Sequence, residues 1–565
     1  MIELFLSILL LSYYIFASGN LFILFIFKKN NFSFELAEYG FLGIIFLTIL
    51  TYIIHFFLPL NQINNFILFL IILILGTILN FNKLWNLIKS NLIFLIFSFF
   101  IVVLMSIKFK VNEDYGYYHL PYIVNLISEK VIFGLANLQV NFAWNSSWLN
   151  FSSILYLPVL ELKGVLLSNS ILTIYVFIFL LNEIIKPKNV GKLSFFYLLF
   201  LSTYIFIKFA RISEHGFDFP ANFFLLISFY YLLKIHEIEN EIEIKKNFIL
   251  LLFFSIYCVT IKLSTFISPF IFLVAVILLI KKKIKINFLS KSLSISFFLF
   301  LLWTTQQFIY SGCFISFFDF TCFKNLPWYV QDITFSVSDA TGAVNKSFNE
   351  YKGYLSKEEY IENFNWIGTW FNRNKIELSE HLISILFPII LLIILSYFNG
   401  SNKNLVFSKN VKHDKLYYIL IFSISILGLA IWFIKSPVIR FGVPYIYIFI
   451  FLIFYYFLIS KLIKQRLNYF PIYIILIVSL SFNMIKNFNR SIKVDKLEYW
   501  PEILNVKYSS NIIDDMQINF PNEKNDNYHK KKYCWSIPFI CHMNAGNNLK
   551  FQRKNNYLII SKKFN

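Results

Sequence analysis

The stretch NLIFLIFSFFIVVLMSIKF (residues 91–109), together with the NEDYGYYH that follows it at residues 112–119, decides how this chain folds. The first part is almost wholly apolar and has the length of about 20 residues that a helix needs to cross a bilayer. The second part places Glu113 and Asp114 where that helix would leave the membrane. Acidic groups at the rim of a span are costly to bury, so they must be solvated, paired or used in chemistry.

The composition extends this pattern to the whole chain. Of its 565 residues, 58% are hydrophobic, and the mean hydropathy is +0.64. A soluble protein of this length cannot bury so much apolar surface, whereas a lipid bilayer can cover it. The sequence therefore predicts an all-α polytopic membrane protein. The many Phe, Tyr, Ile, Asn and Lys residues are typical of an AT-rich genome, and we do not interpret the aromatic residues as a stacking surface for nucleic acid.

Fourteen segments are apolar enough to be candidate membrane spans. Two of them, residues 247–261 and 264–280, are also compatible with a single hairpin. The candidates are residues 3–27, 37–59, 64–81, 91–109, 164–185, 193–210, 219–236, 247–261, 264–280, 292–310, 379–398, 415–434, 440–461 and 468–485. We therefore expect a multi-span domain over residues 1–485 and a small extracytoplasmic tail over residues 486–565.

Basic residues gather between these spans and account for the net charge of +20. If the spans alternate, the basic loops all fall on one side, which the positive-inside rule assigns to the cytoplasm. The outer face then receives residues 110–163, 311–378 and the tail. A membrane protein of this kind explains the positive charge without a nucleic-acid partner.

The five cysteines fit this orientation. Cys258 lies inside a span, whereas Cys313, Cys322, Cys534 and Cys541 all fall on the predicted outer face. An even number of cysteines in an oxidising compartment indicates disulfides. Three pairings are possible, of which we favour the local one, Cys313 with Cys322 and Cys534 with Cys541.

Two acidic positions on the outer face are candidates for catalysis. Glu113 and Asp114 precede a segment with helical apolar spacing, which predicts an amphipathic helix at the outer interface. Asp114 would start that helix, so it is a better candidate for a general base than Glu113. Asp218, in the segment RISEHGFDFP at residues 211–220, is the second acid. The alternative for both Asp residues is a helix-starting role, since carboxylates are favourable near helix N-termini.

Two cations are candidates for binding a phosphate. Lys262 is a lone cation between two apolar segments, and Arg440 lies at the outer end of a span. A guanidinium is well shaped for a phosphate. The alternatives are a snorkelling lysine and an interfacial arginine anchor.

Further polar and aromatic residues on the outer face are candidates for binding a substrate. Asn145 lies in a loop rich in Asn, Ser and Trp, side chains that suit sugar hydroxyls and sugar C–H faces. His119, His215 and Trp328 complete this set. The histidines and acids are also compatible with a divalent cation, although no spacing requires one. The chain has no Walker loop, dinucleotide-binding fingerprint or nucleophile elbow, so nothing indicates a nucleotide or redox cofactor.

These motifs give the chain a resemblance to two groups of proteins. The acidic motif in the first large outer loop resembles that of the GT-C superfamily of integral-membrane glycosyltransferases, with Glu113-Asp114 in that place and Asp218 as a second acidic outer position. The segments EDY at 113–115, GLANL at 134–138, NSSW at 145–148, RFG at 440–442 and CW at 534–535 look like those of large bacterial envelope proteins of uncertain activity. The chain departs from GT-C in its three leading spans and in lacking an Asp-Asp pair.

The resemblance implies a hexosyl or pentosyl transferase in the bacterial inner membrane, with its active face toward the periplasm or cell exterior. The donor would be a polyprenyl-phosphate-linked sugar and the acceptor an envelope glycan or lipid. Asp114 would take the acceptor proton, and Lys262 and Arg440 would stabilise the leaving phosphate. An O-antigen-type glycan polymerase or ligase and a transporter or flippase of lipid-linked glycans remain alternatives. A transporter should show charges near mid-membrane or broken helices in paired halves.

Overall fold

The computed structural model describes residues 2–27, 32–107, 114–186, 192–208, 216–331, 342–398, 415–459, 469–492, 505–522, 532–543 and 549–562, together with residues 333, 334, 336 and 503. The first half of these is a series of helices: α1 (Ile2–Phe27), α2 (Leu36–Phe57), α3 (Gln62–Ile78), α4 (Phe81–Ser90), α5 (Leu92–Ser106), α6 (Leu120–Ser128), α7 (Ser147–Ser153), α8 (Glu161–Leu166), α9 (Ser168–Ile185), α10 (Leu193–Lys208), α11 (Asp218–Glu237) and α12 (Glu241–Ile261). A π-helical turn, Tyr115–His119, precedes α6.

The second half continues with helices and ends in strands. The helices are α13 (Ser268–Lys281), α14 (Ser290–Ser311), α16 (Lys357–Ile361), α17 (Ile367–Phe398), α18 (Lys415–Lys435), α19 (Ile439–Phe454) and α21 (Tyr469–Ile492). The strands are β1 (Tyr508–Ile513), β2 (Met516–Pro521), β3 (Leu549–Lys554) and β4 (Tyr557–Lys562). The expected helical membrane fold is thus confirmed, with two hairpins added in the tail.

Eleven helical segments of the described chain are long and apolar enough to cross a membrane, or twelve if one bent pair is a single span. The other predicted spans are helical as well, but they are interrupted or short. Residues 64–81 fall on α3, which meets α4 at an angle of 86°. α5 and α10 lie within the candidates 91–109 and 193–210, and their 15 and 16 residues give helices of about 23 and 24 Å.

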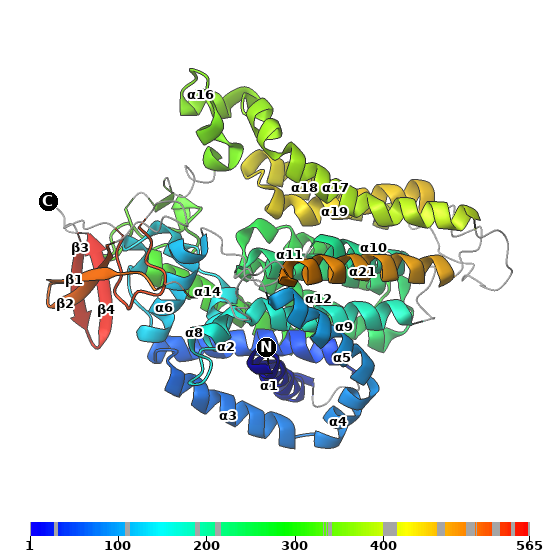
Figure 1. Ribbon diagram of the computed structural model, residues 1–565, viewed down its shortest axis with the longest axis horizontal. Helices are drawn as coiled ribbons and strands as arrows, with labels where there is room; N and C mark the ends of the chain where they lie inside the picture. The colour runs from blue at the N-terminus through cyan, green and yellow to red at the C-terminus, as the bar shows by residue number, and fades with distance from the viewer. Residues whose placement is uncertain are drawn as a thin grey trace.

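The helices pack in three layers (Figure 1). A central layer contains α9, α10, α11, α12 and α21, with α1 to α5 on one side and α17, α18 and α19 on the other. Within the central layer, α11 packs against α12 and α10, and it also contacts α13 and α19. The two β-hairpins lie together at one end of the helices, which we call the cap face.

The opposite end of the helices carries a buried network of ion pairs. The Glu183 carboxylate contacts Lys186 and Lys234, each at 2.9 Å, and accepts a hydrogen bond from the Tyr230 hydroxyl at 2.5 Å. Lys246 approaches Glu38 at 3.2 Å in the same region. Segments that the charge pattern predicts to share the cytoplasmic side therefore do lie at one end of the molecule.

The hairpins of the tail pack against the loops of the cap face. Each turns at two residues with positive φ, Asp514-Asp515 and Asn555-Asn556, which is the conformation of a tight two-residue hairpin. The backbone of Phe133 exchanges hydrogen bonds with β4 at 2.9 and 2.8 Å, and Arg553 of β3 pairs with Glu129. The tail is thereby held at the ends of the helices.

The favoured disulfide pairing, Cys313–Cys322 and Cys534–Cys541, is confirmed, and Cys258 is free and buried. The helix predicted after Asp114 is present as α6, but the prediction that it lies at the surface is wrong. Residues 120–126 of α6 are buried all round, because the cap-face loops and the tail cover the side that the pattern left for water.

Candidate functional site

Four charged side chains from distant parts of the sequence meet at the cap-face end of the bundle. Asp114 directly precedes the π-helical turn, and Asp218 is the first residue of α11. Lys262 lies between α12 and α13 in an extended conformation, and Arg440 is in the first turn of α19. We call these four residues the ion cluster. Two acids and two cations make the cluster neutral as a whole.

Asp218 is the centre of the ion cluster, because both of its carboxylate oxygens are engaged. Oδ1 accepts a hydrogen bond from the Lys262 ammonium, and Oδ2 lies 3.0 Å from Nε of Arg440. The carboxylate also stands in the first turn of α11, where the helix dipole favours negative charge. Asp218 therefore fixes the positions of both cations.

Asp114 is bound from the other side of Arg440. Its Oδ2 accepts a hydrogen bond from Nη2 of the guanidinium at 3.1 Å. The side chains of Arg440, Asp218 and Asp114 are 44%, 29% and 28% exposed, against 15% for Lys262. Arg440 is therefore the most exposed member of the cluster, and a ligand can approach the cluster at its guanidinium.

Aromatic rings surround the Lys262 ammonium. It lies 3.4 Å from the centroid of the Phe441 ring and 5.2 Å from that of Phe217, distances at which a cation is attracted to the ring face.

Burial lowers the pKa of Lys262 to about 8, although the Asp218 carboxylate acts in the opposite direction. Burial also raises the pKa of Tyr118 well above its usual value, and the charges of Asp114 and Asp218 add to the effect. The Tyr118 hydroxyl thus stays protonated as a hydrogen-bond donor.

Hydrogen bonds between the elements hold the cluster in place. The side-chain amide of Asn222 in α11 donates to the Arg440 carbonyl at 2.8 Å, which links α11 to α19. The Ser146 hydroxyl donates to the Ile261 carbonyl at 2.9 Å, and the Tyr445 hydroxyl donates to the carbonyl of Ser264. The turn that carries Lys262 is therefore fixed on both sides by loops and helices of the cap face.

The tail covers the segment that bears Asp114. The Trp535 amide donates to the Gly116 carbonyl at 3.1 Å, and the indole lies so close that a methyl group on Gly116 would stand 2.2 Å from it. Tyr115 meets the same indole edge-on at 5.8 Å. Since Cys534 is bonded to Cys541, a disulfide-closed loop of the tail rests on the π-helical turn.

The remaining predicted site residues lie in three different surroundings. His119 is buried next to the cluster, 4.9 Å from Phe217 between ring centroids, and interacts electrostatically with Asp218. Asn145 instead donates to the Trp303 carbonyl at 3.0 Å and to Gln306 at 3.2 Å, within a polar network on α14. Trp328 packs against Phe133 under the second hairpin. The structure brings neither Asn145 nor Trp328 into the ion cluster. Glu113 and His215 lie outside the described residues.

Several residues of the site were not among the predicted ones. Tyr118, Phe217 and Phe441 line the cluster, and each is within four residues of a predicted charged residue. Their closeness in sequence to the charged residues could have indicated them. However, the chain has 71 Phe and 34 Tyr residues, so an aromatic residue near a charged one is not distinctive. In the described part of the chain, no group of three or more His, Cys, Asp or Glu side chains is placed to hold a metal ion.

Comparison with known proteins identifies a family but no activity. A model of a domain of unknown function, DUF8201, matches residues 1–447, which include all four members of the ion cluster. No curated protein and no solved structure matches the chain.

Proposed function

The chain belongs to the DUF8201 family, and because the function of that family is unknown, we propose a role from the ion cluster itself. The role is transfer of a sugar from a polyprenyl-phosphate-linked donor to a hydroxyl of an envelope glycan or lipid, at the cap face of the membrane. The observation that carries the proposal is the junction of Asp114, Arg440, Asp218 and Lys262 at the ends of membrane-spanning helices. A candidate base and two phosphate-binding cations meet where a lipid-linked substrate is available.

Each charged group has a distinct part in the proposed reaction. Asp114 takes the proton of the acceptor hydroxyl, whose oxygen attacks the anomeric carbon as the bond from that carbon to the phosphate oxygen breaks. The leaving lipid phosphate carries the charge that develops. Arg440 and Lys262 stabilise this charge, and they are already oriented for it by Asp218.

The geometry favours Asp114 over Asp218 as the base. Both oxygens of Asp218 are engaged with cations, so taking up a proton there would disrupt two ion pairs. Within the ion cluster, Asp114 contacts Arg440 through Oδ2. An incoming phosphate at Arg440 would compete with Asp114 for the guanidinium and so place the carboxylate next to the reacting centre.

A strain that carries Asp114→Asn tests the proposed function. The matched control is Glu129→Gln, because Glu129 is also an acid paired with an arginine, Arg553, on the cap face but outside the cluster. We expect the Asp114→Asn strain to lose an envelope glycan or glycolipid in a mass-spectrometric profile, and the Glu129→Gln strain to keep it. A glycan and lipid profile unchanged by Asp114→Asn, at equal protein level, would refute the general-base role.

A further inference from the structure

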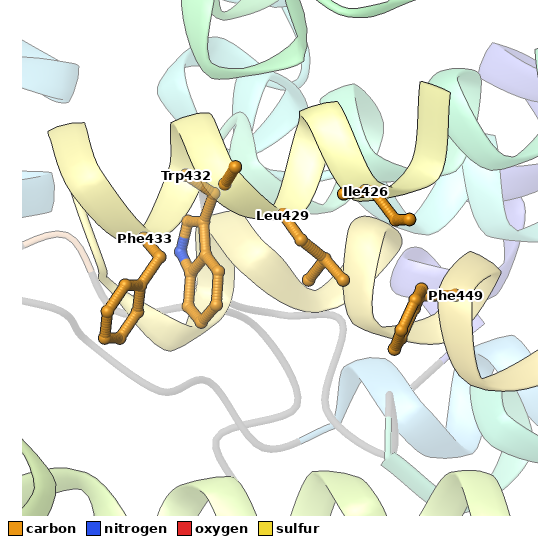
Figure 2. Close-up of a pocket in the computed structure, with 6 residues that line it drawn as sticks. Ile426, Leu429, Trp432, Phe433 and Phe449 are labelled. Carbon is orange, nitrogen blue, oxygen red and sulfur yellow. The ribbon is translucent and has the colours of Figure 1, made fainter. Parts of the chain in front are cut away.

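An apolar groove opens between α18 and α19, apart from the ion cluster. It has a volume of about 360 Å³ and is lined by Ile426, Leu429, Ala430, Trp432 and Phe433 of α18 and by Phe449 of α19. Figure 2 shows Leu429, Trp432 and Phe433 directed to the same side of α18, with Phe449 on the neighbouring helix. α18 is the least buried of the candidate spans in the described chain, because only 22% of the residues in its 18-residue apolar stretch are buried within the protein. In a membrane, this groove faces lipid.

Two lysines stand at the cap-face end of the same helix pair. Lys435 ends α18 and is exposed, and Lys346 is buried in the neighbouring loop. The side chain of Asn345 donates to the Ser436 hydroxyl at 2.8 Å, which brings the two lysine-bearing segments together. Among the described residues, neither lysine forms an ion pair with an acid. Burial lowers the pKa of Lys346, and the charge of Lys435 lowers it further.

Aromatic residues connect the lysine pair to the groove. The Lys346 ammonium lies 5.2 Å from the ring centroid of Trp366, and Trp366 packs at 5.0 Å against Phe433, which lines the groove. Two indole N–H groups hold the turn between α18 and α19. Trp370 donates to the Pro437 carbonyl at 2.6 Å, and Trp432 donates to the Val438 carbonyl at 2.7 Å. Tryptophan is typical of the depth at which lipid headgroups meet the acyl region.

We propose that Lys346, Lys435 and the α18–α19 groove form a binding site for an anionic phospholipid of the leaflet at the cap face. The phosphate lies between the two lysines, and one acyl chain fills the groove. Charge complementarity supports an anionic headgroup, since neither lysine forms an ion pair with an acid in the part of the chain that the structure describes. A bound lipid also stabilises the turn between α18 and α19, which precedes Arg440.

Lipid binding by the purified full-length protein tests this site without any activity assay. The protein is reconstituted in nanodiscs of phosphatidylcholine with or without phosphatidylglycerol, and bound lipid is counted by native mass spectrometry alongside Tm. We expect phosphatidylglycerol to be retained and to raise Tm. The double variant Lys346→Gln/Lys435→Gln should bind it about 30-fold more weakly, the effect of two lysines near an anionic headgroup. Lys324→Gln, which removes an exposed lysine paired with Asp319, should bind it as wild type does.

Three results would overturn the proposal. The first is equal retention of phosphatidylcholine and phosphatidylglycerol by the wild-type protein, a comparison that does not depend on whether any variant folds. The second is unchanged binding by a folded double variant or by Leu429→Trp, which fills the groove and leaves both lysines in place. The third is displacement of phosphatidylglycerol by undecaprenyl phosphate through the same lysines, which would assign the site to a substrate.

Discussion

At the scale of single residues, the two aspartates of the ion cluster differ in what they contact. Asp218 engages both cations, whereas Asp114 contacts Arg440 through Oδ2. The sequence predicted all four cluster residues as candidates, because charged residues at the ends of apolar spans are few. It did not predict which acid holds the cations, since that depends on how α11, α12 and α19 pack. Asn145 and Trp328 have the right chemistry for a sugar, but the fold places them elsewhere.

Replacing each aspartate by asparagine should separate these two roles. Asp218→Asn leaves Lys262 and Arg440 without their common partner, so we expect a loss of about 1–3 kcal/mol in stability and a lower Tm. Asp114→Asn should leave Tm nearly unchanged and slow sugar transfer by at least about 100-fold. Thermal unfolding of the purified variants measures the first effect. Equal Tm values for the two variants would contradict the structural role of Asp218.

The charge of Lys262 predicts a pH dependence of the proposed transfer. Its pKa is lowered to about 8, so the ammonium is charged below this pH and becomes neutral as the pH rises through it. Stabilisation of the leaving phosphate should therefore weaken above pH 8, and the rate should fall. Lys262→Arg keeps its charge over this range and should show no such fall. A pH–rate profile that is the same for both proteins would argue against Lys262 as the phosphate-binding cation.

At the scale of elements, hydropathy predicted the helices well and the tail poorly. The apolar runs leave little choice but helices in a membrane, because every backbone polar group must be satisfied internally. The tail is rich in Asn and Lys, and its two hairpins were not predicted. Two features of the sequence indicated them. One is the turn residues Asp514-Asp515 and Asn555-Asn556, and the other is the spacing of Leu549 and Phe551, which are buried at alternate positions of β3. The contact of Trp535 with Gly116 joins segments too distant in sequence for local patterns to reveal.

Gly116→Ala tests whether the tail holds the segment that bears Asp114. The added methyl group would stand 2.2 Å from the Trp535 ring, so the tail must shift, at a cost of about 1–3 kcal/mol. We expect faster proteolysis of the tail in the variant. Gly368→Ala is the control, since a methyl group there meets nothing within 4 Å. Equal proteolysis of both variants would mean that the Trp535 contact does not hold the tail.

At the scale of the whole molecule, charge is concentrated at the two ends of the helices. On α11, Asp218 and Lys234 belong to the clusters at opposite ends, about 24 Å apart along the helix axis. This separation is close to the roughly 30 Å of a bilayer's hydrocarbon core. The two clusters thus mark the two faces of the membrane protein. The basic loops predict which face is cytoplasmic, but the packing of the helices is the same in either orientation.

Labelling of single introduced cysteines determines the orientation. Tyr354 is fully exposed in the loop before α16, on the side where the ion cluster lies, and it is replaced in Tyr354→Cys. Ile242 is exposed in α12 at the opposite end, and it is replaced in Ile242→Cys. Of the native cysteines, four are in disulfides and Cys258 is buried. A membrane-impermeant maleimide should label Tyr354→Cys in intact cells and Ile242→Cys after permeabilisation only. The reverse pattern would place the ion cluster in the cytoplasm.

The most direct test of the central claim is sugar transfer by the purified protein in nanodiscs that contain a polyprenyl-phosphate-linked pentose or hexose and a hydroxyl acceptor. The wild-type protein and Glu129→Gln should form product and release polyprenyl phosphate. Asp114→Asn should be slower by at least about 100-fold, the effect of losing a general base. Release of polyprenyl phosphate at the wild-type rate by Asp114→Asn, or no transfer by the wild-type protein from any donor of this class, would contradict the account.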